Sequence, residues 1–190
     1  MSAVGLLVAS ASGGRGLTGA WGLLTRVGVT RQWAALDELV GRAGQIPEIE
    51  AVILIGSLAS ATADAVSDVD AILVIRECSF PSAYGQRHAL HGASVAACWD
   101  HLTDPPSEVA AHKWIDESGV LVEVLLATAS GPLRVAEPAR VILGDPGVLS
   151  RTRRRPPIRR DEMTGSPDPI EAAYDRLKEA VRHVAPPSAT

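Results

Sequence analysis

The chain has 190 residues and a formal net charge of −4 at pH 7. This length suffices for one domain with a sizeable hydrophobic core. The acidic balance argues against a dedicated nucleic-acid binder, which is usually basic, and no apolar run approaches the ~20 residues that a membrane-spanning helix needs.

The N-terminal part predicts an extension followed by one helix. Residues 1–29 are rich in Gly, Ala and Ser without a sustained period, which is typical of a poorly ordered segment. An apolar stretch at 4–11 lacks the preceding positive charge of a signal peptide. Residues 30–43 predict an amphipathic helix with Thr30 as its N-cap. Trp33 in this helix could stack on a base, but a core position is favoured.

Residues 51–75, AVILIGSLASATADAVSDVDAILVI, are the most informative stretch. Two β-branched apolar runs flank a segment of small and polar residues, which predicts strand, turn, short helix and strand. Asp68 and Asp70 stand at the head of the second strand, and side chains at i and i+2 of a strand share a face. Their Cα atoms would then lie roughly 7 Å apart.

Two carboxylates at this spacing favour a bound cation. Without one, each raises the pKa of the other by repulsion. Mg²⁺ takes hard oxygen ligands and is held in phosphoryl-transfer sites by one or two carboxylates and substrate phosphates. Gly56 allows a tight turn and close approach of a ligand. Ser57 is expected to cap the short helix, whose N-terminal N–H groups would face a phosphate.

The middle of the chain predicts a further strand and a further helix. Residues 76–92 contain Pro and Gly and are typical of a loop or short helix at the rim of the site. Residues 93–99 predict a strand, and 104–115, opened by Pro-Pro-Ser, predict a helix. Four histidines share no metal-binding spacing, and neither do the two cysteines, so we expect structural or surface roles and a reducing cytoplasm; these residues are His88, His91, His101, His112, Cys78 and Cys98.

Residues 120–127, VLVEVLLA, predict an apolar strand with one charge, Glu123. Burying a charge is costly without a partner. Glu123 therefore either faces water from an edge strand or lies beside Asp68 and Asp70 on a neighbouring strand. In the second case it would be a third metal ligand or a general base for an acceptor hydroxyl, and the sequence leaves both roles open.

The C-terminal part predicts a last strand at 140–145 and a final helix. Residues 150–160 carry six arginines and two prolines. They would form a clamp for phosphates or RNA, or, as we favour, a flexible linker. Residues 169–184 predict a helix with Asp168 as its N-cap and an apolar stripe at Ile170, Tyr174, Leu177 and Val181. The predicted organisation is an extension at 1–29, a domain at 30–149, a linker at 150–168, and a C-terminal helix and tail at 169–190.

The combination of Gly56-Ser57, ten residues, Ser67-Asp68-Val69-Asp70 and an apolar strand resembles the signature of the polymerase-beta-type nucleotidyltransferases. The likeness covers about 47–145 and is greatest to minimal and antibiotic-modifying members. It implies an α/β (α+β) fold with a small mixed sheet flanked by helices. It also implies that Gly56, Ser57 and Ser67 bind the nucleotide, that Asp68 and Asp70 bind Mg²⁺ or Mn²⁺, and that Glu123 completes the site.

The resemblance predicts an enzyme that moves a nucleoside monophosphate from an NTP, ATP by preference, to a hydroxyl acceptor, and the cysteine usage predicts that it is cytoplasmic. The acceptor would be a small molecule or a partner protein, and the protein could also act as a homodimer. Family members often carry an Arg soon after Gly-Ser and a further Gly before the acidic pair, where this chain has Leu58, Ser60 and Ala61. An antitoxin-like partner protein and a degenerate domain used as a binding module therefore stay open as alternatives.

Overall fold

The computed structural model describes residues 28–92, 95–104, 108–131, 134–155 and 169–184. The strands of this part of the chain are β1 Ile49–Ile55, β2 Val69–Ile75, β3 Val95–Asp104, β4 Val109–Asp116, β5 Leu121–Thr128, β6 Arg134–Ala136, β7 Arg140–Leu143 and β8 Arg153–Arg155. The α-helices are α1 Thr30–Ala43, α2 Gly56–Ser60, α3 Phe80–Gly85, α4 Val148–Arg151 and α5 Pro169–Val184, and η1 Arg87–Leu90 is a 3-10 helix.

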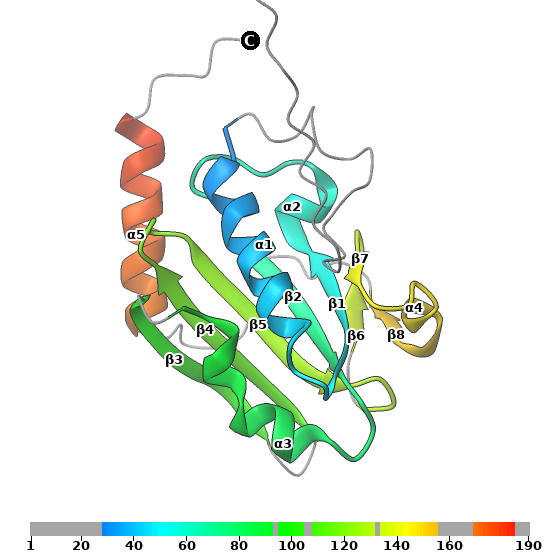
Figure 1. Ribbon diagram of the computed structural model, residues 1–190. Coiled ribbons are helices and arrows are strands. Elements are labelled where there is room, and N and C mark those ends of the chain that lie inside the picture. The colour runs from blue at the N-terminus through cyan, green and yellow to red at the C-terminus, as the bar shows by residue number, and fades with distance from the viewer. Residues whose placement is uncertain (1–27, 93–94, 105–107, 132–133, 156–168, 185–190) are drawn as a thin grey trace, which may run out of the picture.

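Six of the strands form one mixed sheet in the order β3-β4-β5-β2-β1-β7 (Figure 1). The β2–β5 pair is parallel and the other pairs of this sheet are antiparallel. β6 and β8 form a separate parallel pair. The protein is therefore of the mixed α/β class, as the sequence predicts, while likeness to a nucleotidyltransferase fold stays a prediction.

Both faces of the central strands are buried. Along β1, Val52 and Leu54 join one hydrophobic cluster together with residues of α1, while Ala51 and Ile53 join a second cluster with Val148. Successive side chains of a strand point to opposite faces, so strands covered on both sides read as continuous apolar runs. This is why the runs at 51–55 and 71–75 predicted the strands correctly.

Several predicted elements are confirmed. α1 spans Thr30–Ala43 as expected, and Trp33 packs partly buried against the core, as the favoured interpretation requires. The strand, short helix and strand of the central stretch are present as β1, α2 and β2. α3 and η1 occupy the predicted loop or short helix at 76–92, and β5 and β7 match the predicted later strands.

The helix predicted at 104–115 is wrong. β3 runs on to Asp104, past the expected end at residue 99, and β4 occupies Val109–Asp116 between β3 and β5. Backbone pairing on both sides of β4 outweighs the helix propensity of Ala110 and Ala111, because strand preference depends mainly on packing and neighbours. The Pro-Pro-Ser segment at 105–107 lies outside the described residues.

The predicted helix caps are also wrong where they can be checked. Val29, not Thr30, is the N-cap residue of α1, and α2 begins at Gly56 with Ile55 as its N-cap residue. Neither cap residue makes a side-chain hydrogen bond. Ser57 is the second residue of α2, so it lies inside the helix and does not cap it. Asp168 lies outside the described residues.

The C-terminal part departs from the expected linker and apolar stripe. Arg140–Leu143 is followed by α4 and by β8, which pairs with β6, so 150–155 is structured, while 156–168 lies outside the described residues. In α5, Leu177 is 60% exposed and so does not belong to a buried stripe. None of the described helices is both long enough and apolar enough to cross a membrane.

Candidate functional site

Asp70 and Glu123 lie side by side on neighbouring strands. They are direct partners in the parallel β2–β5 register, so their side chains leave the sheet on the same face. β5 is an interior strand between β4 and β2, which excludes the alternative of an edge strand for Glu123. Asp68 precedes β2 by one residue, and its charge acts on the carboxyl group of Asp70, while that of Glu123 acts on both aspartates. The structure thus gathers the three predicted acidic residues.

The glycine of the Gly-Ser bend lies directly against Asp70. Ile55 is the register partner of Asp70 across β1 and β2, so the chain turns into α2 beside the carboxylate. Gly56 has φ +70, and a Cβ atom built on it would lie 2.5 Å from Asp70 Oδ2. Only glycine accepts both the left-handed conformation and this approach without strain.

Asp68 and Asp70 are held in an environment that disfavours their charge. Burial, followed by repulsion from Glu123 and then from Asp68, raises the pKa of Asp70 from its ordinary 3.8 to about 7. Burial likewise raises the pKa of Asp68, against the opposing effect of Lys178. Asp68 Oδ1 is buried and has no hydrogen-bond partner within the described part of the chain. A buried carboxylate oxygen without a donor, among repelling carboxylates, fits a cation site.

Sequence reasoning missed the two lysines of the chain, which both reach this site. Lys178 Nζ lies 2.7 Å from Asp68 Oδ2 and 2.9 Å from Asp175 Oδ1. Lys113 Nζ lies 2.9 Å from Glu123 Oε2, and Lys113 is the register partner of Glu123 across β4 and β5. For Lys113 the sequence did contain a signal, because it is the single charged residue within the largely apolar residues 109–115. The same kind of signal, one charge within an apolar run, singled out Glu123.

Helix α5 is positioned over the site by a tyrosine. The Tyr174 hydroxyl donates to Gly119 O at 2.9 Å and accepts from the Leu121 N–H at 3.1 Å. One turn further along the helix, Lys178 lies over the Tyr174 ring and reaches Asp68. A cavity of about 260 Å³ lies here and is lined in part by Gln32, Ser67, Tyr174 and Lys178. Glu123 remains 37% exposed, so a ligand can reach it.

The two predicted nucleotide-binding serines differ in their surroundings. The Ser67 hydroxyl donates to Asp64 Oδ1 and accepts from the Asp64 N–H, both at 2.8 Å, so it stabilises the loop before β2. Ser57 lies in the first turn of α2, partly buried, and its carbonyl accepts the Thr62 N–H at 3.0 Å. Ser57 thus directly follows Gly56, the glycine that approaches Asp70 closely, whereas Ser67 belongs to the loop that connects α2 to β2.

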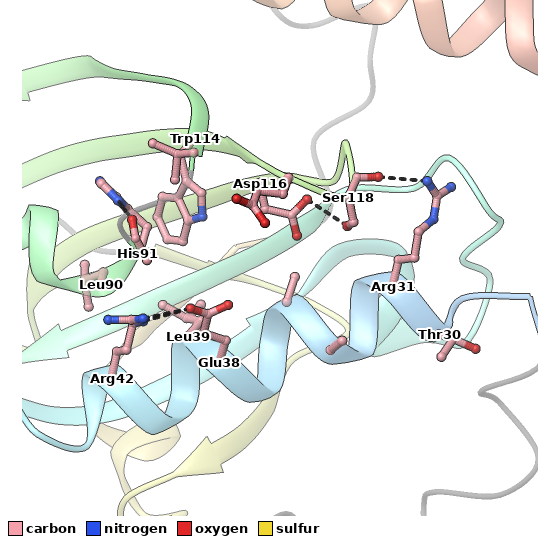
Figure 2. Close-up of a pocket in the computed structure, with 15 residues that line it drawn as sticks. Thr30, Arg31, Glu38, Leu39, Arg42, Leu90, His91, Trp114, Asp116 and Ser118 are labelled. Carbon is pink, nitrogen blue, oxygen red and sulfur yellow. Dashed lines mark hydrogen bonds and ion pairs between the residues drawn. The ribbon is translucent and has the colours of Figure 1, made fainter.

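A larger cavity, of about 520 Å³, lies elsewhere, between α1, the end of η1 and the β4–β5 turn (Figure 2). Its charged lining includes Arg31, Glu38, Arg42 and Asp116, and Arg31 Nη1 donates to Ser118 O at 2.9 Å. Trp114 lines it from the face of β4 opposite to Lys113. The acidic site and this cavity are thus on opposite faces of the sheet.

Removing the Lys178 ammonium is expected to destabilise the metal-free protein by about 1–3 kcal/mol, because it leaves the partly buried carboxylates of Asp68 and Asp175 without their partner. Lys178→Ala should lower the urea midpoint, whereas Arg176→Ala, at an exposed position of the same helix, should not. Millimolar Mg²⁺ should restore part of the loss in Lys178→Ala by supplying the missing positive charge. Equal midpoints for the two variants would contradict this role of Lys178.

Comparisons with known proteins give no assignment: no protein-family model matches the chain, and no curated protein matches it significantly. What the fold and the site define is a mixed α/β protein in which three carboxylates and two lysines meet beside a glycine bend.

Proposed function

We propose that the protein is a Mg²⁺-dependent nucleotidyltransferase that moves a nucleoside monophosphate from an NTP, ATP by preference, to a hydroxyl acceptor. The observation that carries the proposal is the pairing of Asp70 with Glu123 in register, with Gly56 packed against the Asp70 carboxylate. Acidic groups from two strands beside a bend that accepts close approach of a ligand suit the binding of a metal–triphosphate complex.

The donor set supports Mg²⁺, or Mn²⁺, at Asp68 and Asp70, with Glu123 available as a third ligand. The unpartnered Asp68 Oδ1 and the raised pKa of Asp70 both indicate unmet negative charge when no cation is bound. Such an ion would supply neutralisation of phosphate charge. Among the described residues these carboxylates do not form a set with all ligand atoms within 4.8 Å of one another. Two of them are held in ion pairs, Asp68 with Lys178 and Glu123 with Lys113.

The residues of the chain would divide the remaining work. Gly56 and Ser57 would hold the β- and γ-phosphates through backbone and hydroxyl donors. Glu123, accessible from solvent, would accept the proton of the acceptor hydroxyl as general base. Lys178, at the rim of the adjoining cavity, would exchange its partner Asp68 for a phosphate oxygen when the nucleotide binds.

The test is calorimetry of ATP binding, followed by a search for adenylylated product with labelled ATP and candidate hydroxyl acceptors. ATP should bind only with Mg²⁺ or Mn²⁺. Glu123→Gln should retain most of the ATP affinity while lowering transfer by about 10²–10⁴, the usual contribution of a general base. Equal affinity for ATP with and without the metal would overturn the proposal.

A second candidate function is a binding module, for example an antitoxin-like protein that binds a protein partner and either modifies it or does not. It is favoured by the absence, after the Gly-Ser bend, of the Arg that members of the resembled family often carry as a phosphate donor. Leu58 follows the bend instead, and it is buried in the core and cannot contact a phosphate. It is favoured also by the lysines, which neutralise two acids without a ligand. Partner binding that survives Asp70→Asn, without ATP binding by the wild type, would support this alternative.

A further inference from the structure

Two histidines and one cysteine come together on the face of the sheet away from Asp70 and Glu123. His88 lies in η1, His91 directly follows it, and Cys98 lies on β3. One ligand atom from each of the three residues lies within 4.8 Å of the other two. The spacing of the two histidines along the chain does not by itself indicate a metal site, because the third candidate ligand, Cys98, comes from a separate strand.

The His91 ring is oriented by the backbone carbonyl of the next residue, Gly92. Its Nδ1 lies 3.1 Å from Gly92 O. Since a carbonyl oxygen only accepts, Nδ1 carries the proton and Nε2 presents a lone pair. Nε2 is buried and has no hydrogen-bond partner in the described segments. Metal-binding histidines commonly use this arrangement, in which one ring nitrogen donates to a carbonyl or carboxylate and the other binds the ion.

A third histidine, His112, lies with its ring close to those of His88 and His91. His112 is fully buried, and its Nδ1 lies 2.9 Å from Asp100 Oδ1. Its ring centroid lies 5.0 Å from that of His88 and 5.4 Å from that of His91. His112 Nε2, like His91 Nε2, finds no hydrogen-bond partner among the residues that the structure describes. His91 Nε2 and His112 Nε2 thus belong to neighbouring rings, and a buried polar atom without a hydrogen-bond partner needs an explanation, of which an ion bound to His91 Nε2 is one.

The neighbouring charges permit a cation here. The guanidinium of Arg87, next to His88 in the chain, is paired with the Asp100 carboxylate at 2.9 Å. Asp100 thus offsets Arg87 while also orienting His112. His88 and Cys98 are exposed, so their side chains can close by the ~1 Å needed to reach metal–ligand bonds of about 2.0–2.3 Å.

We propose that His88, His91 and Cys98 bind a transition-metal ion of the Zn²⁺ type, with the fourth position open. Imidazole nitrogen and thiolate sulfur are ligands that Zn²⁺ prefers and Mg²⁺ does not. The site is therefore separate in chemistry, as well as in place, from the carboxylates. His91 and Trp114 border the larger cavity together, so the ion would lie at its edge (Figure 2).

The test uses the full chain, with any affinity tag removed, and titrates it with Zn²⁺ against a chromogenic chelator and with Co²⁺ by absorbance. The wild type should bind one ion per chain, and the Co²⁺ form should show a thiolate charge-transfer band. Cys98→Ser should abolish that band and weaken Zn²⁺ binding by about tenfold or more, and His88→Gln, at an exposed position, should also weaken it.

Two matched variants show whether the bound ion belongs to this cluster. Cys78→Ser replaces the other exposed free cysteine and should leave Zn²⁺ affinity and the Co²⁺ band unchanged. Asp70→Asn should also leave both unchanged, because it alters only the acidic site. Binding that persists in Cys98→Ser and His88→Gln, or a wild type that binds no stoichiometric Zn²⁺, would overturn the proposal.

Discussion

Asp70→Asn is expected to lower the proposed nucleotidyl transfer severely and, at the same time, to stabilise the metal-free protein at pH 8. Charge neutralisation by a bound cation contributes several kcal/mol to phosphoryl chemistry, so transfer should fall by about a thousandfold or more. The stabilisation has a separate cause. Asp70 is held among Glu123 and Asp68 in a buried place, where its ionised form is unfavourable.

The sign of the pH dependence follows from proton linkage. The pKa of Asp70 is about 7 in the folded protein against an ordinary 3.8, so between these values the folded state binds more protons than the unfolded state. The contribution of Asp70 to stability therefore falls as pH rises from about 4 to about 7, and its full cost is present above 7. Asparagine carries no charge and avoids this cost.

Urea unfolding of metal-free wild type and Asp70→Asn at pH 5 and pH 8 measures the effect. The variant should gain stability relative to wild type at pH 8 and lose most of that advantage at pH 5. Asp37→Asn, at an exposed position of α1, is the matched control and should show no such difference. If the difference in unfolding free energy between Asp70→Asn and wild type were the same at pH 5 and pH 8, burial and repulsion would not act on the Asp70 carboxyl group.

The second large effect is expected from Gly56→Ala. The new Cβ would lie 2.5 Å from Asp70 Oδ2 and 3.3 Å from Asp70 Cγ, at a residue with φ +70. Left-handed backbone at a non-glycine residue costs about 1–3 kcal/mol, and relief of the overlap must displace the Asp70 carboxylate. We therefore expect a loss of about 2 kcal/mol or more in stability, together with loss of the proposed metal-dependent ATP binding.

Gly28→Ala separates backbone strain from overlap. Gly28 has φ +92 and open space around the position of a Cβ, so it should lose only the strain energy and keep ATP binding. Urea unfolding and calorimetry of both variants provide the measurement. If Gly56→Ala and Gly28→Ala were equally stable and both bound ATP as the wild type does, the close approach of Gly56 to Asp70 would have no functional importance.

The elements that were predicted correctly have local causes. α1 carries its apolar residues at helical spacing, and β1, β2 and β5 are apolar runs because the sheet is covered on both faces. The prediction of a helix at 104–115 was wrong because the neighbouring strands decide the secondary structure of this segment. Ala110 and Ala111 favour a helix in isolation, but β3 and β5 offer backbone pairing on both sides.

The candidate sites show the same division. Asp68, Asp70 and Glu123 were recognisable because a charge within or beside an apolar strand needs a reason. The role of Lys178 was not recognisable, because 110 residues separate it from Asp68 along the chain. The cluster of His88, His91 and Cys98 was likewise hidden, since no sequence spacing indicates that η1 and the residue after it lie close to β3.

By itself, the sequence determined which segments are buried strands and which carboxylates interrupt them, because burial of apolar residues and the cost of burying charge are local properties of the chain. Only the tertiary structure decided which strands are neighbours, which lysines neutralise the acids and which ring nitrogens find no partner among the described residues. These depend on contacts between distant segments, and strand order and helix docking are set by packing of the whole domain.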